Sequence, residues 1–299
     1  MKDRFEYLLF HLMALLVRLI PRKLLPKIGK GLGTVLFHLN IRKKVVQRNL
    51  EIAFGSELNT EERSRLSKKT YQNIGIILFE FLLLKHILPE KLSEYIEIEG
   101  LDILKSAIAE GKGVVLAGNH FGNWELISAA ISTQGAPIHI YAGKQRNSLF
   151  DNALNGIRQR FGTVTISKSK TATIEMMKVL KNNEVLGMAG DLNVPNNKLF
   201  IDFFGKKAAV GRGLASFALS RGTPLIFIWC VRTGPLQHVG RLCRVQYDPS
   251  GDKPTDLLMI SQSLTRILEQ KIREHPDQYF WFNKRWKTRP AEENGSDIY

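Results

Sequence analysis

Cysteine is scarce in this sequence, with two among 299 residues. Cys230 and Cys243 cannot form the disulfide framework that stabilises many small secreted domains, and their spacing is not that of a metal site. Cys230 lies within the apolar run 225–231, which is typical of a buried strand. We therefore expect a protein of a reducing compartment whose stability comes from its core.

Acidic residues are few relative to basic ones: 28 Asp and Glu against 43 Lys and Arg give a formal net charge of +15. Such an excess predicts an anionic partner, which can be nucleic acid, an anionic membrane surface or an acidic protein. Nucleic acid is the least favoured of the three. The sequence has neither zinc-ligand spacing nor a strand with the aromatic and basic residues of an RNA-recognition motif.

No apolar run reaches the ~20 residues that a membrane-spanning helix usually needs. The longest, residues 5–20, has three polar interruptions and stops at Pro21, and no small-residue cleavage site of a signal peptide follows. Basic side chains recur from Arg18 to Arg48 with no acidic residue before Glu51. An apolar helix followed by basic residues is typical of an anchor on the cytoplasmic side of a membrane. Spanning and interfacial binding stay open, and a core helix with a solvated basic flank is the alternative.

Two regions with different patterns follow one another along the chain. Residues 1–90 are predicted to be helical and membrane-associating. Their last helix, over residues 60–86, is apolar on nearly every side towards its end, as in helices that are buried or face lipid. From Tyr95 short apolar strands alternate with helices, which predicts an α/β domain over residues 91–290, a mostly parallel sheet with helices on both faces. Residues 291–299 are polar and are predicted to be a flexible tail.

The residues that could carry chemistry lie between a predicted strand over residues 113–117 and a helix that continues through Leu126. In α/β proteins, ligands bind at such carboxyl ends of strands. The single histidine at this place, His120, could be structural. However, Glu125 could turn back, hydrogen bond one imidazole nitrogen and leave the other free as a base. This pair suits deprotonation of a hydroxyl that attacks an activated acyl group.

The same segment limits the mechanism. No serine or cysteine stands in a nucleophile elbow, which favours direct transfer over a covalent acyl-enzyme. No second histidine or cysteine lies at ligand spacing from His120, so no metal ion is expected. The backbone N–H groups of Gly122 and Asn123, or a nearby arginine, could stabilise the negative charge that develops in the transition state, and Asn123 could cap the following helix.

The block Asn119–Glu125, with the sequence Asn-His-Phe-Gly-Asn-Trp-Glu, resembles the His-x-x-x-x-Asp/Glu motif of the glycerolipid acyltransferase superfamily. More narrowly, it resembles the late lipid A acyltransferases, the lauroyl and myristoyl transferases of Gram-negative bacteria. The likeness spans roughly residues 5–290, and Leu192 and Asn283 depart from it, because the family usually has glutamine and histidine there. Other segments resemble the family in the same order along the chain: Arg48-Asn49-Leu50 followed by Ala53-Phe54, Lys144-Gln145-Arg146-Asn147, Arg158, Phe203-Phe204-Gly205 and residues 279–287.

The resemblance implies a glycerolipid acyltransferase-like fold and transfer of a fatty acyl chain from acyl carrier protein to a hydroxyl of a phosphorylated, Kdo-bearing lipid A precursor. It implies a protein on the cytoplasmic side of the bacterial inner membrane that uses no cofactor. His120 would take the proton from the acceptor hydroxyl, and Glu125 would orient His120.

Six further residues are predicted to contact a substrate or to orient such a contact. Arginine binds phosphate and carboxylate groups bidentately, a basic cluster suits an acidic carrier protein or a lipid phosphate, and an aspartate at a strand end could orient an arginine. A solvated surface position or an ordinary strand end is the alternative for each. The six are Arg146, Arg158, Asp191, Lys206, Arg212 and Arg285.

Three other functions are compatible with the sequence. A related acyltransferase would act on a lysophospholipid or a glycolipid with acyl-CoA, with the same chemistry in different pockets. A basic nucleic-acid-binding protein would bind nonspecific DNA with a steep salt dependence. A membrane scaffold with the same fold would not depend on His120. The departures at Leu192 and Asn283 make the acceptor the least constrained part of the prediction.

Overall fold

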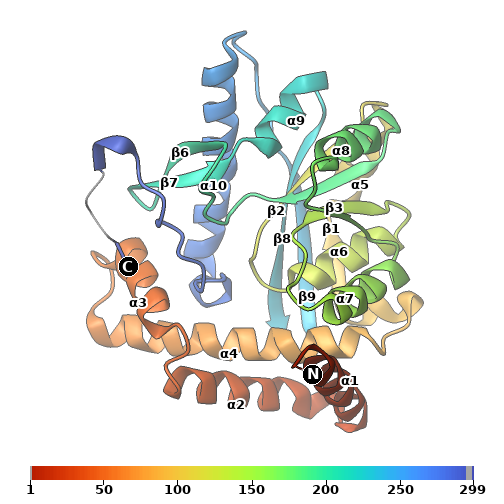
Figure 1. The fold of residues 1–299 in the computed structure, drawn as a ribbon, viewed down its shortest axis with the longest axis vertical. Helices are drawn as coiled ribbons and strands as arrows, with labels where there is room; N and C mark the ends of the chain where they lie inside the picture. The colour runs from red at the N-terminus through yellow and green to blue at the C-terminus, as the bar shows by residue number, and fades with distance from the viewer. Residues whose placement is uncertain (1, 294–297) are drawn as a thin grey trace.

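The strands and helices predicted after Tyr95 form a layered α/β fold in the computed structural model, which describes residues 2–293 and 298–299 (Figure 1). The strands are β1 (Ile96–Glu99), β2 (Val114–Gly118), β3 (Ile138–Ala142), β4 (Val164–Ser167), β5 (Val185–Ala189), β6 (Lys198–Phe203), β7 (Lys206–Gly211), β8 (Leu225–Gly234) and β9 (Gln237–Arg244). The main sheet has the order β1-β9-β8-β2-β5-β3-β4, and β6 and β7 form a separate hairpin.

Neighbouring strands of the main sheet run parallel, except for β8 and β9, which are antiparallel. The prediction of a mostly parallel sheet is confirmed. β2 lies between β8 and β5, where both faces of the sheet are covered, and this is why residues 114–117 are apolar without interruption. Because β2, β3 and β5 are parallel, their carboxyl ends lie on one edge of the sheet.

Helices cover both faces of the sheet, as predicted. They are α5 (Leu101–Ala109), α6 (Trp124–Thr133), α7 (Ser148–Arg160), α8 (Ala172–Lys181), α9 (Gly213–Arg221) and α10 (Lys253–Glu274). Alternate residues of β2 belong to different hydrophobic cores. Val115 and Ala117 belong to the core that includes residues of α8, α9 and α10, whereas Val114 and Leu116 belong to the core of α5, α6 and α7.

The N-terminal region is helical, with α1 (Lys2–Leu19), α2 (Leu25–His38), α3 (Lys43–Phe54) and α4 (Thr60–Leu84). In Figure 1, α4 runs beneath the strands, and α2 lies along its outer side. The backbones of α2 and α4 come into close contact at glycines. A Cβ atom on Gly33 would lie 2.1 Å from the Tyr71 carbonyl oxygen, and one on Gly75 would lie 2.2 Å from that of Gly29. Between residues 2 and 293, no helix combines the length and the apolar character needed to cross a membrane.

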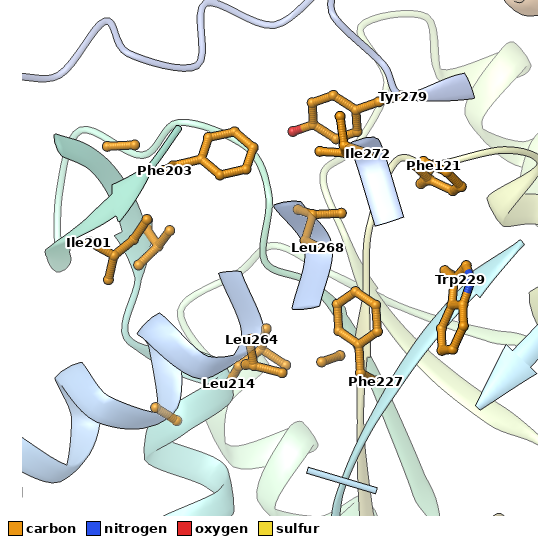
Figure 2. Close-up of a cluster of buried hydrophobic side chains, with 14 of the residues drawn as sticks. Phe121, Ile201, Phe203, Leu214, Phe227, Trp229, Leu264, Leu268, Ile272 and Tyr279 are labelled. Atoms are coloured by element: carbon orange, nitrogen blue, oxygen red, sulfur yellow. The ribbon is translucent and has the colours of Figure 1, made fainter. Parts of the chain in front are cut away.

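One pair of strands is not predicted by the sequence pattern. β6 and β7 are joined by Phe204 and Gly205, whose φ angles of 51° and 68° are those of a tight two-residue hairpin turn. Such turns usually contain Asn-Gly or Asp-Gly, so Phe-Gly gave no signal. The Phe204 ring packs against Trp281, with ring centroids 6.0 Å apart. Ile201 and Phe203 of β6 enter the same core beside α10 (Figure 2). The Phe-Phe-Gly motif is thus a turn that supplies side chains to the core.

The segment after α10 returns to the N-terminal helices. The side-chain amide of Asn49, in α3, donates to the carbonyl oxygens of Trp281 and Asn283 at 2.6 and 2.7 Å. These bonds give Asn49, the central residue of the Arg48-Asn49-Leu50 motif, a structural role. Of the predicted tail, Ile298 is buried, and residues 294–297 lie outside the described residues.

Candidate active site

His120 and Asp191 meet at the carboxyl edge of the sheet because they follow two neighbouring parallel strands. Gly118, the last residue of β2, pairs with Ala189, the last residue of β5. The imidazole Nδ1 of His120 lies 2.9 Å from Asp191 Oδ1, and the backbone N–H of His120 donates to Asp191 Oδ2 at 2.9 Å. One buried carboxylate therefore fixes both the ring and the main chain of His120.

The surroundings of this pair favour a charged imidazole. Burial lowers the pKa of His120, but the negative charge and the hydrogen bond of Asp191 outweigh it, and the pKa is raised above its ordinary value. For Asp191, burial raises the pKa, but the charge of His120 and the hydrogen bonds from it prevail, and the pKa is lowered. Because Asp191 holds Nδ1, Nε2 is the nitrogen left to exchange a proton with a substrate.

The structure corrects the predicted partner of the imidazole. Glu125, in the first turn of α6, forms a bidentate ion pair with Arg158 of α7, with Oε1 2.6 Å from Nη2 and Oε2 3.0 Å from Nε. The hydrogen bond expected from Glu125 to His120 is made by Asp191 instead. Since α6 begins at Trp124, the Glu125 side chain projects from the first helical turn towards α7 rather than back towards the strand end. Glu125 acts on His120 through its charge, which adds to the rise of the imidazole pKa.

One of the two backbone groups predicted to stabilise an oxyanion already has an acceptor. The N–H of Gly122 donates to the Gln278 carbonyl oxygen at 2.8 Å. This contact corrects the oxyanion role predicted for Gly122, whereas the role of the Asn123 N–H stays a prediction. The predicted helix cap is present, because Asn123 Oδ1 accepts the N–H of Leu126 at 3.0 Å.

The turn that carries His120 is held against β8 and the C-terminal segment. The carbonyl oxygen of His120 accepts the N–H of Phe280 at 2.9 Å. The rings of Trp124 and Phe280 flank the imidazole, with centroids 5.1 and 5.9 Å away. Gly122 has a φ of +58°, and a Cβ atom there would lie 1.7 Å from the Cys230 carbonyl oxygen. Only glycine fits this position of the motif.

Three of the predicted substrate contacts lie in loops or at strand ends. Arg146 is exposed between β3 and α7. Lys206 is the first residue of β7, and Arg212 follows its last residue. The Nε of Arg212 donates to the carbonyl oxygen of Lys198 at 3.3 Å. The structure does not join these three residues to the His120–Asp191 pair, and their contacts with a substrate stay predictions.

Arg285 does not have the predicted role. Its side chain is 2% exposed and donates from Nη1 to the carbonyl oxygen of Ala209 at 2.6 Å, so a substrate cannot reach it. Its positive charge contributes, after the effects of burial and His120, to lowering the pKa of Asp191. Arg285 therefore supports the His120–Asp191 pair from within the core.

A small cavity of about 30 Å³ lies beside this pair, between the sheet and helices α9 and α10. Its polar edge includes Asn119 and Asp191. Its apolar wall includes residues that also appear in Figure 2: Leu214, Phe227, Leu264 and Leu268. Across residues 2–293 and 298–299, no three His, Cys, Asp or Glu side chains are grouped so that they could hold a metal ion.

Sequence reasoning missed two features of the site. It noted Asp191 at a strand end but not its contact with His120, which becomes visible only when β2 and β5 are known to be neighbours. It also missed the support that Gln278 and Phe280 give to the turn. The resemblance of residues 279–287 to a family signature was the only signal for this second feature.

Comparison with known proteins decides the family. Residues 3–288 match the model of a family described as bacterial lipid A biosynthesis acyltransferase. The chain belongs to this family. The lipid A acyltransferases are O-acyltransferases, so the predicted family and the predicted type of enzyme are both confirmed.

Individual acyltransferases are similar over most of their length. The chain is 27% identical to the lipid A biosynthesis lauroyltransferase of Escherichia coli K12, over 92% of this chain and 89% of the relative. It is 26% identical to the lipid A biosynthesis palmitoleoyltransferase of the same organism, over 86% and 82%. The phosphatidylinositol mannoside acyltransferase of Mycobacterium tuberculosis is 26% identical over 67% of this chain and 63% of the relative.

Proposed function

We propose that this acyltransferase transfers a fatty acyl chain from acyl carrier protein to a hydroxyl of a Kdo-bearing lipid A precursor, with His120 as the general base. The observation that carries the proposal is the His120–Asp191 pair at the carboxyl edge of the sheet, in a chain of the lipid A acyltransferase family. A histidine that a carboxylate holds through Nδ1 can activate a hydroxyl with Nε2.

The proposed reaction needs no covalent enzyme intermediate. Nε2 of His120 takes the proton from the acceptor hydroxyl while the hydroxyl oxygen bonds to the thioester carbonyl carbon. The electron pair of the carbonyl moves to its oxygen. When this tetrahedral intermediate collapses, the carbon–sulfur bond breaks and the imidazolium gives its proton to the leaving thiolate. Asp191 stabilises the imidazolium between these steps, and the charge of Glu125 adds to this effect.

We further propose that α1 lies on the cytoplasmic surface of the bacterial inner membrane. One side of α1 packs on the protein through Phe10, Ala14 and Val17. The other side exposes large apolar side chains: Phe5, Leu8, Leu9, Leu12, Leu15, Leu16 and Leu19. An exposed apolar helix face beside a basic segment suits an anionic lipid surface.

The position of α1 also supports a lipid acceptor. The side-chain amide of Asn147, which caps α7 beside the carboxyl edge of the sheet, donates to the Asp3 carbonyl oxygen at 2.9 Å and to Glu6 Oε2 at 3.0 Å. The start of α1 is therefore attached close to the edge that carries His120, and a lipid held at α1 would have a short path to the site.

A second acceptor class has specific support. The mycobacterial relative is named for a phosphatidylinositol mannoside, which is a glycosylated phospholipid. The same His120 chemistry would serve a glycolipid or lysophospholipid hydroxyl with acyl-CoA as the donor.

Mass spectrometry of lipid A from cells that lack this protein and then regain it tests the proposal. We expect one additional acyl group when the wild-type protein returns and none when His120→Ala returns. A purified assay that offers acyl carrier protein and acyl-CoA thioesters in parallel identifies the donor. An unchanged lipid A profile with altered phospholipids or glycolipids would favour the second acceptor class. Acyl transfer by His120→Ala at the wild-type rate would contradict the assignment of the base.

A further inference from the structure

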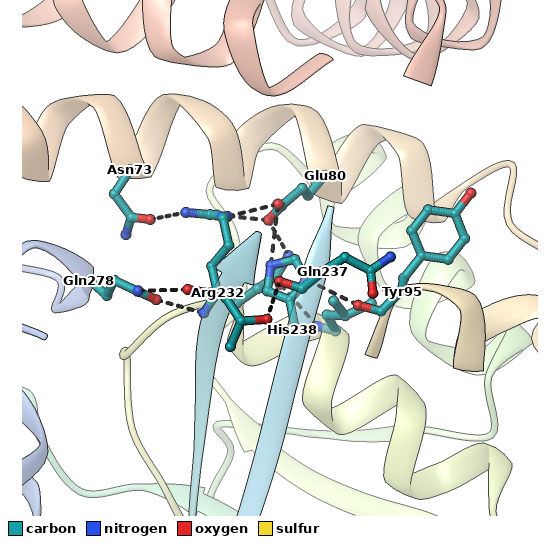
Figure 3. Close-up of polar contacts among 10 residues, drawn as sticks. Asn73, Glu80, Tyr95, Arg232, Gln237, His238 and Gln278 are labelled. Carbon is teal, nitrogen blue, oxygen red and sulfur yellow. Dashed lines mark hydrogen bonds and ion pairs between the residues drawn. The ribbon is translucent and has the colours of Figure 1, made fainter. Parts of the chain in front are cut away.

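A buried ionic cluster joins α4 to strands β8 and β9 (Figure 3). Its centre is Glu80, which is 5% exposed. Arg232 of β8 donates to the Glu80 carboxylate from Nε at 3.0 Å and from Nη2 at 2.9 Å, and Nε2 of His238 lies 3.2 Å from Oε1. Burial raises the pKa of Glu80, but the hydrogen bonds and charges of His238 and Arg232 prevail and lower it to about 2. Glu80 is therefore ionised at neutral pH.

Glu80 also contacts the turn that carries His120. Its Oε2 accepts a hydrogen bond from Asn123 Nδ2 at 2.9 Å. The acceptor end of the same amide, Oδ1, caps α6 by accepting the N–H of Leu126. An amide has one donor end and one acceptor end, so the carboxylate determines which way the fully buried Asn123 faces.

A second route from Glu80 to the turn passes through the C-terminal segment. The N–H of Arg232 donates to Gln278 Oε1 at 2.8 Å, and Gln278 Nε2 donates to the Arg232 carbonyl oxygen at 3.1 Å. The Gln278 carbonyl oxygen accepts the N–H of Gly122 at 2.8 Å. Glu80 holds Arg232, and Arg232 thus holds the residue that fixes the main chain two positions after His120.

We propose that Glu80 is a positioning residue for His120, acting through Asn123 and through Arg232 and Gln278. This inference rests on the proposed role of His120 as the base. Stability alone is a weak reason for such a cluster, because the desolvation of buried charges offsets much of their attraction. Positioning of the His120 side chain is a stronger reason, because an error of about 1 Å in a catalytic geometry can lower a rate about 100-fold.

The experiment replaces the two partners of one hydrogen bond, the donor amide of Asn123 and the acceptor carboxylate of Glu80. Glu80→Gln removes the charge and replaces one acceptor oxygen with an NH2 donor, so the side chain cannot keep both bonds from Arg232 together with the bond from Asn123. Asn123→Ser keeps a helix-capping side chain and leaves the ion pair of Glu80 and Arg232 in place, but removes the amide that reaches Glu80. The double variant Glu80→Gln/Asn123→Asp again places one amide against one carboxylate. Glu99→Gln, in the exposed bidentate pair with Arg241, is the matched control.

Steady-state acyl transfer and thermal unfolding are measured for each purified variant. We expect kcat to fall about 10–100-fold in Glu80→Gln and in Asn123→Ser. KM for either substrate should stay within about threefold of the wild-type value, because the affected step is turnover. The double variant should regain about tenfold in kcat over Glu80→Gln, because the two sites are coupled. Glu99→Gln should keep the wild-type kcat.

A purely structural role of Glu80 gives a different result: the variants would unfold at lower temperature with kcat within about twofold of the wild-type value, and this would overturn the inference. Asn123→Ser decides the matter even if Glu80→Gln does not fold, since the ion pair is intact in Asn123→Ser. His120→Ala is measured alongside. If His120→Ala is inactive while Asn123→Ser has normal turnover, the positioning role of Glu80 is wrong and the proposed function stands. If His120→Ala is fully active, the assignment of His120 as the base is wrong.

Discussion

Asp191 holds His120 at two points, through imidazole Nδ1 and through the backbone N–H, both at 2.9 Å. A carboxylate that binds the ring and the main chain together leaves the imidazole little freedom to rotate. The same contact opposes the effect of burial on the imidazole and raises the pKa of His120.

Asp191→Asn tests this contact. A base must be neutral to accept a proton, so the raised pKa of His120 means that activity rises with pH through a range above the ordinary value for histidine. Without the charge of Asp191 the pKa falls, and the acidic limb of kcat/KM moves to lower pH. We also expect kcat to fall about 100-fold or more, because the ring loses its orientation. A pH series of kcat/KM measures both effects.

Glu125→Gln is the comparison for Asp191→Asn. Glu125 contributes less than Asp191 to the raised pKa of His120, so the acidic limb should move in the same direction but by a smaller amount. An acidic limb that does not move in either variant would show that a group other than His120 titrates in the reaction.

Breaking the ion pair of Glu125 and Arg158 from one side should lower the stability of the fold. A second substitution, at the other partner, should restore most of it. Arg158→Met leaves the carboxylate, whose side chain is 15% exposed, without its bidentate partner. We expect the free energy of unfolding to fall by about 1.5–3 kcal/mol. Glu125→Gln/Arg158→Met should regain most of it, because no unpaired charge remains. Urea unfolding measures each value. Arg241→Met, which breaks the exposed pair with Glu99, should cost less than about 1 kcal/mol.

Gly122→Ala should be far more damaging than an alanine at Gly135, although both glycines have positive φ and flank α6. Strain of the left-handed conformation costs about 1–2 kcal/mol at either position. Only at Gly122 would the new Cβ also overlap a carbonyl oxygen, that of Cys230, whereas nothing lies within 4 Å at Gly135. Gly135→Ala should therefore stay folded and active, and Gly122→Ala should lose its activity. Equal stability and activity of the two variants would contradict the close contact with β8.

Membrane binding through α1 is tested by comparing two double variants, one in α1 and one in α10, at side chains with nearly equal exposed fractions. Leu12 and Leu16 of α1 are 52% and 44% exposed, and Met259 and Leu258 of α10 are 52% and 43% exposed. Leu12→Glu/Leu16→Glu should weaken co-sedimentation with anionic phospholipid vesicles about tenfold or more, because two apolar side chains no longer enter the lipid. Leu258→Glu/Met259→Glu should bind like the wild-type protein. Equal binding by the two double variants would place the membrane contact elsewhere.

The layered fold and the place of the turn that carries His120 could be predicted because both follow from local patterns. The apolar run before Asn119 is a central strand covered on both faces, and the alternation of strands with helices produces a mostly parallel sheet. The hairpin of β6 and β7 could not be predicted, since Phe204 occupies a positive-φ turn position that rarely carries an aromatic residue.

The partner of His120 could not be predicted, because it depends on the order of the strands. The local pattern predicts Glu125, which is five positions away in the chain, whereas Asp191 is 71 positions away. Nothing local specifies that β5 lies beside β2. Glu80 lies within the predicted helix over residues 60–86, and its contact with Asn123 joins positions 43 apart. Such contacts arise from packing between elements and leave no periodic trace in the sequence.

The turn that carries His120 is completed by residues 278–280, which lie far beyond His120 in the sequence. During synthesis the N-terminal part of a chain emerges first and folds first. His120, Asp191 and Glu125 therefore all leave the ribosome long before the segment that secures the turn. A nascent chain, or one cut short before residue 278, carries every residue proposed for catalysis and still lacks the geometry. Acyl transfer is thus expected to begin only after residues 278–280 have been synthesised, so a chain that stops before them would not act on its lipid substrate.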